Sequence, residues 1–175
     1  MHPRIDAFDA RVERTIEPFR TPVLDRVAYS ISSAADHSLL WFIVGAARSV
    51  QSGDLGFALR FAAAMGAESA VTNGPIKTMF RRARPTPDTA AGPLPYGMHR
   101  PITSSFPSGH ATAAFTAAVL LSGPRNRAPW YALASVVAAS RVYVRMHHAS
   151  DVVVGAGVGM AMGYGLKRWV RTPGG

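Results

Sequence analysis

The sequence contains no cysteine, little charge and no long uninterrupted hydrophobic run. Without cysteine, the 175-residue chain has no disulfide bond, no thiolate metal site and no cysteine nucleophile. Charged residues make up 17% of the chain and hydrophobic residues 48%, whereas soluble proteins typically contain about 25% charged residues. This composition argues against an intrinsically disordered chain. The length fits one domain, over residues 1–175.

The charge that is present is mostly positive. Lys and Arg total 19 against 10 Asp and Glu, which gives a net charge of +9. Such a balance is typical of proteins that bind nucleic acid or an anionic membrane surface. No recognised nucleic-acid motif and no basic groove with interleaved aromatic residues accompanies it, so we expect no nucleic-acid partner. A non-enzymatic basic protein, which would bind DNA or anionic lipid in a salt-dependent way without hydrolysis, is the alternative from another class.

Residues 1–33 are predicted to form an amphipathic N-terminal segment. Five Arg and five acidic residues fall within residues 1–26. Apolar residues recur there at helical spacing: Ile5, Phe8, Val12, Ile16 and Phe19. We therefore expect a helix with a mixed-charge outer face, ended or kinked near Pro18 and Pro22. The pattern fits a helix packed on its own protein as well as an interfacial helix on a bilayer, and it lacks the features of a signal peptide.

Residues 34–170 are predicted to form a helical core of five apolar segments. The segments cover residues 34–50, 56–76, 108–122, 129–146 and 151–170. None has the 18 uninterrupted apolar residues of a simple membrane span, and the mean hydropathy of the chain is only +0.09. Hydropathy alone therefore does not separate a membrane bundle from a soluble α-bundle.

The spacing of glycines in the last segment favours a membrane bundle over a soluble one. Gly155, Gly159 and Gly163 share one face of the last segment. In an aqueous helix each would cost about 1 kcal/mol, whereas in a bilayer small residues at this spacing let helices approach closely. We predict an all-α, polytopic transmembrane helical bundle of about five spans. The sequence leaves open whether the glycine face packs helices within one chain or between the chains of a homo-oligomer.

The positive charges also predict a topology. If all five segments span, residues 123–128 and 167–175 lie on one side of the membrane and residues 77–107 and 141–150 on the other. The first side carries cations and no acid: Arg125, Arg127, Lys167, Arg168 and Arg171. The positive-inside rule makes that side cytoplasmic. We therefore expect a multi-pass protein of the cell (inner) membrane whose remaining polar loops face the extracytoplasmic side.

Three polar clusters interrupt the apolar segments. The first runs from Lys77 to Arg84-Pro85 and also contains Arg81 and Arg82. Four cations in eight residues suit a lipid-headgroup patch. They equally suit a phosphate clamp, in which a Lys point charge and a planar Arg fork bind the oxygens of one anion.

The second cluster is Pro107-Ser108-Gly109-His110, at the start of the third segment. Proline is typical of a first helical turn. Glycine lets the backbone come close to a ligand, so the N–H groups of Ser108 and Gly109 can point at an anion beside the positive end of the helix dipole. His110 would then stand next to that anion.

The third cluster contains Ser140-Arg141, His147 and Asp151. His147 and Asp151 are four residues apart, so a helical path would place them within hydrogen-bond reach. A carboxylate on one ring nitrogen leaves the other free to act as a base or nucleophile. Histidines with an aspartate also suit a divalent metal, but the neighbouring cations would repel one. We therefore expect an anion site without metal or cofactor.

In order along the chain, the three clusters resemble the signature of the type 2 phosphatidic acid phosphatase family, which also includes acid phosphatases and vanadium haloperoxidases. The matched pattern is Lys-x6-Arg-Pro, then Pro-Ser-Gly-His, then Ser-Arg-x5-His-x3-Asp, over roughly residues 70–160. One departure is His148-Ala149, where the family has an aromatic residue and proline. Small actinobacterial members linked to decaprenylphosphoryl-phosphoribose dephosphorylation are similar in size and composition.

The resemblance implies roles for the matched residues. His147 would be the nucleophile and form a phosphohistidine, Asp151 would orient it, and His110 would protonate the leaving alkoxide. The phosphoryl oxygens would be held by Lys77, Arg84, Ser108, Gly109 and Arg141. Three fixed cations can stabilise a phosphoryl transition state without Mg²⁺. We expect Arg81, Arg82, Arg145 and His148 to be solvated or headgroup-facing charges.

These expectations predict an integral-membrane lipid phosphatase acting on a phosphomonoester or diphosphate, with a polyprenyl-linked substrate favoured. Phosphatidic acid and phosphatidylglycerophosphate are alternative substrates. A soluble-type acid phosphatase or haloperoxidase is the alternative with the same site.

Overall fold

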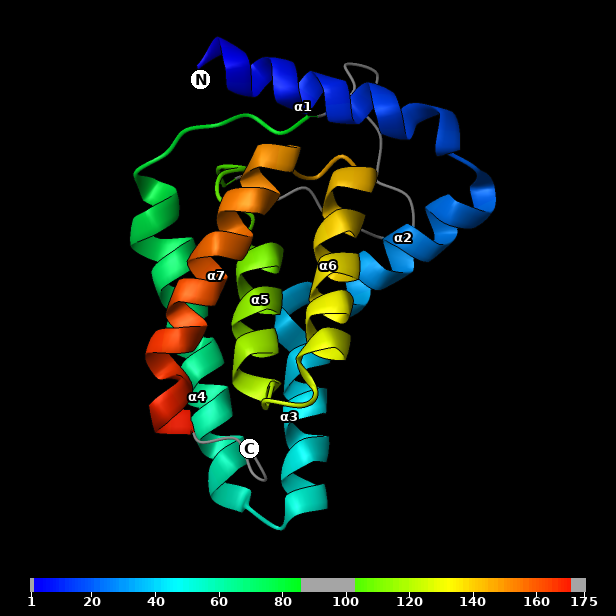
Figure 1. The fold of residues 1–175 in the computed structure, drawn as a ribbon. Helices are drawn as coiled ribbons and strands as arrows, with labels where there is room; N and C mark the ends of the chain where they lie inside the picture. The colour runs from blue at the N-terminus through cyan, green and yellow to red at the C-terminus, as the bar shows by residue number, and fades with distance from the viewer. Residues whose placement is uncertain (1, 86–102, 171–175) are drawn as a thin grey trace.

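The computed structural model describes residues 2–85 and 103–170, which form helices and no strand. The chain begins with α1 (Pro3–Ile16), η1 (Glu17–Phe19), α2 (Pro22–Ala34) and η2 (Asp36–Ser38). It continues with α3 (Leu39–Ser52), α4 (Leu55–Val71), η3 (Thr72–Ile76), α5 (Gly109–Leu121), α6 (Arg127–Tyr143) and α7 (Ala149–Val170) (Figure 1). The predicted all-α class is confirmed, and α3 to α7 follow the five apolar segments closely.

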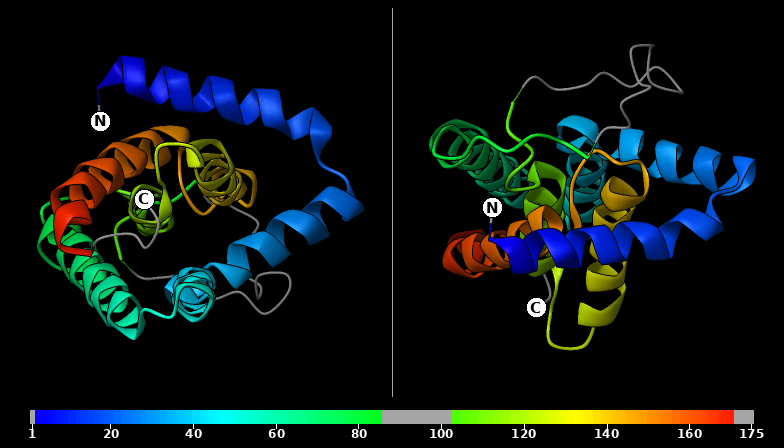
Figure 2. Two further views of the ribbon diagram at one scale, coloured as in Figure 1. Left: turned by 60° about the horizontal axis from the view of Figure 1, so that its bottom comes forward. Right: turned by 90° about the horizontal axis from the view of Figure 1, so that it is seen from above.

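Helix α5 forms the centre of the bundle. It packs against α3, α4, α6 and α7, which surround it when the molecule is viewed along the bundle (Figure 2). Its sequence, GHATAAFTAAVLL, is rich in small side chains, and ten of its thirteen residues are buried. Small residues let neighbouring helices come close on several sides at once. Burial on all sides explains why α5 has no polar face.

The glycine face of α7 packs on α5. A Cβ added at Gly159 would lie 2.2 Å from the carbonyl oxygen of Thr112, and one at Gly155 would lie 2.7 Å from that of Ser108. At Gly163 it would lie 2.7 Å from Val119 Cβ. The hydroxyl of Thr116 donates to the carbonyl of Gly159 across the same contact, at 3.0 Å. The glycine face therefore packs helices within one chain.

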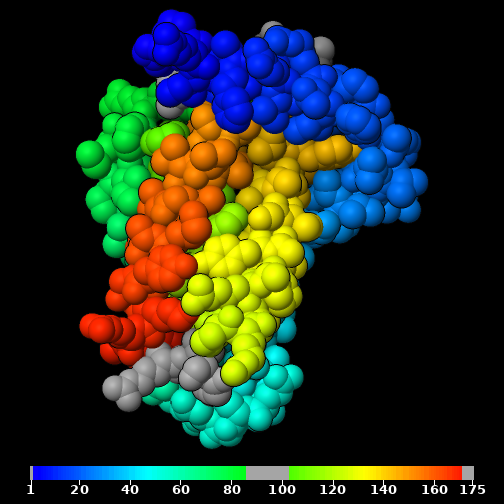
Figure 3. Space-filling view, in the orientation of Figure 1, coloured from blue at the N-terminus to red at the C-terminus, as the bar shows by residue number. Residues whose placement is uncertain are grey.

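Helix α1 lies across the end of the bundle at which α6 ends and α7 begins (Figures 1 and 3). It ends before Pro18, and Pro22 begins α2, where the Thr21 hydroxyl accepts a hydrogen bond from the Leu24 N–H at 3.2 Å. The helix thus packs on its own protein. Its one buried side chain is Asp9, whereas Phe8 is exposed. Asp9 does not belong to the predicted mixed-charge outer face, because it is buried in contact with Arg82 and Ser150.

Within the described residues, α7 is the one helix that is long and apolar enough to cross a membrane, and α5 is a shorter apolar helix. Large apolar side chains are exposed along the outside of the bundle: Leu39, Ile43, Val50, Leu55, Leu59 and Val153. The number of spans, about five, stays a prediction.

Candidate active site

A cavity of about 500 Å³ lies at the end of the bundle where α5 and α7 begin. Its walls come from the α2–α3 corner, the end of α4, Arg84 and Thr103, the start of α5, the end of α6 and the turn between α6 and α7. Residues predicted for the site that line it are Lys77, Arg84, Gly109, His110, Arg141 and His147. Ser108 and Asp151 lie behind this lining, and both are fully buried.

Lys77 reaches the cavity because α4 ends in an irregular turn. Pro75 lies inside the π-helical segment η3, and Gly74 has non-helical torsions there, as expected where a proline removes a helical hydrogen bond. A Cβ added at Gly109 would lie 3.7 Å from Lys77 Nζ and 3.2 Å from Asn73 Oδ1. Burial, together with the nearby cations Arg84 and Arg141, lowers the pKa of Lys77 to about 8, and Glu68 opposes them. The ammonium group is therefore poorly solvated and close to the start of α5.

The ring of His147 is hydrogen-bonded to a backbone carbonyl rather than to a carboxylate. Its Nδ1 lies 2.7 Å from the carbonyl oxygen of Ser105, and because that oxygen only accepts, Nδ1 carries the proton. The Nε2 lone pair then faces Arg84, whose Nη1 lies 3.3 Å away. Burial lowers the pKa of His147 to about 3, opposed by Asp151 and assisted by the cations Arg84 and Arg141. The ring is neutral at pH 7, as a nitrogen nucleophile requires.

Asp151 lies near His147, as predicted, but the two residues are not on one helix. His147 precedes α7, and the two side chains approach to 3.8 Å between Nδ1 and Oδ2. This distance is too long for a hydrogen bond, although it permits a charge interaction. The carboxylate instead accepts from the His148 N–H at 2.9 Å and pairs with Arg82.

Ser108 is placed differently from the expectation. Its hydroxyl accepts from the Ala111 N–H at 3.4 Å and caps α5. Its N–H donates to the carbonyl oxygen of Asp151 at 3.0 Å. That N–H is therefore engaged with α7, and the start of α5 offers the cavity Gly109 and His110 instead.

His110 and Arg141 share a partner that sequence reasoning missed. His110 Nε2 lies 2.8 Å from Asp36 Oδ1, and Arg141 Nη1 lies 3.8 Å from the same oxygen. The Arg141 guanidinium is buried, donates to the Ser32 hydroxyl, and has at Nε no hydrogen-bond partner within the described part of the chain. Asp36 lies in a short helix far from the three clusters, and no motif in the sequence marks it.

Arg82 is also placed differently from the expectation of a solvated charge. It is largely buried, with 13% of its side chain exposed, and pairs with Asp9 and Asp151. Arg145 pairs with Glu13 of α1 and Glu17 of η1, whereas Arg81 is exposed as expected. Asp9, Glu13 and Glu17 are four residues apart, and this spacing is the signal that could have indicated an acidic face directed at these arginines.

Among the described residues, no group of three or more His, Asp or Glu is arranged to hold a metal ion. The cavity instead brings Lys77, Arg84 and Arg141 together with two histidines. Three cations around one buried space suit an anion with several oxygens, such as a phosphoryl group.

Fold and site together define a helical protein with a cationic cavity at one end of the bundle, a cavity whose charge suits a phosphoryl group. The sequence model described as PAP2 superfamily matches residues 57–174, and the chain belongs to this family.

Curated relatives match about half of this chain. Lipid A 1-phosphatase of Porphyromonas gingivalis is 39% identical over 89 residues, which cover 46% of this chain and 20% of that protein. Decaprenylphosphoryl-5-phosphoribose phosphatase of Mycobacterium tuberculosis is 38% identical over 89 residues, covering 50% of this chain and 48% of that protein. The chain thus matches less than half the length of these curated relatives, both of which are phosphatases by name.

Solved structures resemble nearly the whole chain. A transmembrane PAP2 type phosphatidylglycerolphosphate phosphatase from Bacillus subtilis superposes with a TM-score of 0.73 at 24% identity, covering 95% of this chain and 86% of that one. LpxE of Aquifex aeolicus superposes with a TM-score of 0.72 at 25% identity, covering 91% and 94%. The fold is that of membrane PAP2 proteins.

Proposed function

We propose that this protein is an integral-membrane lipid phosphatase that hydrolyses a phosphomonoester or diphosphate of a membrane lipid through a phosphohistidine intermediate. The observation that carries the proposal is the position of His147, a neutral and buried imidazole, in the same cavity as Lys77, Arg84 and Arg141. The buried Nε of Arg141, which has no hydrogen-bond partner among residues 2–85 and 103–170, supports it, because a buried N–H without a partner calls for an acceptor.

In the first step His147 Nε2 attacks phosphorus and the bond from phosphorus to the lipid oxygen breaks. The leaving oxygen takes a proton from Nδ1 of the imidazolium form of His110, whose Nε2–H donates to Asp36. In the second step water attacks the phosphohistidine, with His110 accepting the water proton, and phosphate and free His147 are released. The three cations stabilise the charge on the equatorial oxygens in both steps.

The substrate we favour is polyprenyl-linked. Two observations support a lipid: large apolar side chains are exposed on the outside of the bundle, and the solved structures that it resembles include a transmembrane phosphatase. The polyprenyl assignment follows the relative named as decaprenylphosphoryl-5-phosphoribose phosphatase.

The proposed orientation places the site outside the cytoplasm. Lys167 and Arg168 end α7, and Lys167 Nζ donates to the carbonyl oxygen of Ser122 at 2.7 Å. The cationic end of α7 and the α5–α6 turn therefore lie together, at the end of the bundle away from the cavity (Figure 1). If the positive-inside rule applies, that end is cytoplasmic.

The test is phosphate release in detergent from a panel of lipid phosphates: polyprenyl mono- and diphosphates, a polyprenyl phosphosugar, phosphatidic acid and phosphatidylglycerophosphate. We expect release from a polyprenyl substrate that survives excess EDTA and disappears in His147→Ala. Full activity in His147→Ala, or no release from any substrate, would contradict the proposal.

A further inference from the structure

We propose that Asp9, on the N-terminal helix α1, is a positioning residue for the reaction and acts on His147 through Arg82 and Asp151. The inference rests on the proposed function and extends it to a helix that precedes the matched family region, residues 57–174. It assigns α1 a part in catalysis beyond covering the end of the bundle.

The contacts form one continuous chain of charges. Asp9 Oδ2 lies 2.6 Å from Arg82 Nη2. The other terminal nitrogen of Arg82, Nη1, pairs with Asp151 Oδ1 and donates to the Ser150 hydroxyl at 2.8 Å. The opposite oxygen of Asp151 faces His147 Nδ1 at 3.8 Å. Arg82 is thus clamped between a carboxylate of α1 and a carboxylate of α7.

Asp9 also holds the start of α7 directly. Its Oδ1 accepts from the Ser150 N–H at 2.8 Å, and its Oδ2 accepts from the Ser150 hydroxyl at 2.7 Å. N–H groups in the first turn of a helix have no partner within the helix, so a carboxylate from another helix caps α7 one residue before Asp151. Burial alone would raise the pKa of Asp9, but the bonds from Ser150 and Arg82 outweigh burial and hold it below its ordinary value.

The net charge of Asp9, Arg82 and Asp151 explains how Asp9 can affect the reaction at His147. Arg82 by itself would neutralise Asp151 and leave His147 without a net negative neighbour. With Asp9 added, the three groups carry one net negative charge. The His147 ring becomes cationic when Nε2 bonds to phosphorus, and a net negative charge nearby stabilises that state. Because Asp151 is fully buried and Asp9 nearly so, water screens this interaction weakly.

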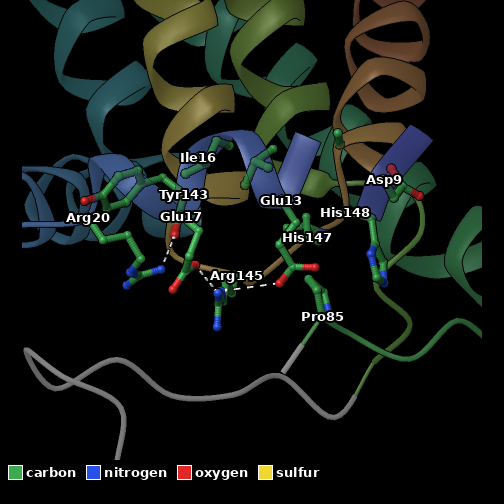
Figure 4. Close-up of a pocket in the computed structure, with 12 residues that line it drawn as sticks. Asp9, Glu13, Ile16, Glu17, Arg20, Pro85, Tyr143, Arg145, His147 and His148 are labelled. Carbon is green, nitrogen blue, oxygen red and sulfur yellow. Dashed lines mark hydrogen bonds and ion pairs between the residues drawn. The ribbon is translucent and has the colours of Figure 1, made fainter. Parts of the chain in front are cut away.

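Other residues than Asp9 also hold the N-terminal segment against the bundle, and this makes the inference testable. Glu13 of α1 and Glu17, which begins η1 directly after it, pair with Arg145, on the loop before His147 (Figure 4). Both glutamates are about half exposed. They hold the N-terminal helical segment against this loop without contacting Arg82 or Asp151 in any described interaction, so they are matched controls on the same segment.

The experiment compares Asp9→Asn with the double variant Glu13→Gln/Glu17→Gln, in detergent-purified full-length protein and with the lipid phosphate that the wild type hydrolyses. We expect kcat of Asp9→Asn to fall about 10- to 100-fold, the range typical of groups that orient a functional histidine. KM should change little, because Asp9 does not contact the substrate. The yield of acid-labile phosphoenzyme in a single turnover should fall in parallel, and Asp9→Glu should recover most of kcat.

The double variant should keep kcat within about twofold, even if its melting temperature falls. Asp9→Ser is a second neutral variant that retains an acceptor for the Ser150 N–H, should Asp9→Asn not fold. The inference fails if the folded neutral variants have the kcat of the wild type, or if the double variant loses as much kcat as they do. Absence of any phosphate release by the wild type would instead remove the proposed function itself.

Discussion

The Nδ1 atom of His147 lies 2.7 Å from the carbonyl oxygen of Ser105 and 3.8 Å from the carboxylate of Asp151. The backbone therefore fixes the tautomer that leaves Nε2 free, and the carboxylate acts on the ring through its charge. This division of roles separates two functions that one aspartate performs in a Ser-His-Asp triad.

Asp151→Asn should be much less damaging than His147→Ala. The Ser105 carbonyl still holds Nδ1–H in the variant, so we expect kcat to fall about 10- to 100-fold, compared with a loss of at least about 10³-fold when the nucleophile is removed. Steady-state kinetics on the same lipid phosphate measures both. Equal losses in the two variants would show that Asp151, rather than Ser105, fixes the tautomer.

Asp36→Asn should slow hydrolysis of substrates whose leaving group needs a proton, and should hardly affect substrates whose leaving group does not. Asp36 accepts from His110 Nε2 at 2.8 Å, and without its charge the protonated ring is less stable. We expect kcat to fall about 10- to 100-fold for an alkyl phosphate, towards the lower end of what a general acid contributes. With p-nitrophenyl phosphate, whose leaving group needs no proton, kcat should stay within about threefold. Equal losses on both substrates would contradict a role through His110.

The apparent affinity for substrate should decrease above pH 8. Burial lowers the pKa of Lys77 to about 8, so its positive charge is present below that pH and is lost as the pH rises through it. We expect kcat/KM to decline with an apparent pKa near 8, mainly through KM. In Lys77→Arg the guanidinium stays charged to above about pH 12, so this decline should disappear. If kcat/KM of that variant still declined above pH 8, the decline would come from a group other than Lys77.

Gly159→Ala should destabilise the bundle, whereas Gly157→Ala should not. A Cβ at Gly159 would lie 2.2 Å from the Thr112 carbonyl oxygen, whereas a Cβ at Gly157 would meet nothing within 4 Å. Forcing α7 away from α5 should cost about 1–3 kcal/mol of unfolding free energy, visible as a lower melting temperature in detergent. Equal melting temperatures for the two variants would mean that α7 does not pack on α5 as described.

The three clusters could be read from the sequence because each is local. Lys77 and Arg84 follow a helix end marked by Pro75, His110 lies in the first turn of α5 after Pro107, and His147 directly precedes α7. Asp36 and Asp9 could not be found this way. The sequence around Asp36 carries no motif, and the acidic spacing around Asp9 does not identify its partners, since Arg82 and Ser150 are 73 and 141 residues away along the chain.

The sequence by itself determined the helical class, the positions of the five apolar segments and the family, because residue spacing within a helix and within a short motif is preserved in the fold. Only the tertiary structure decided that the glycine face of α7 packs on α5 within one chain, that Ser105 rather than Asp151 bonds the His147 ring, and that Arg82 is buried. These are contacts between elements distant in sequence, and they depend on how the helices approach one another, which no local spacing encodes.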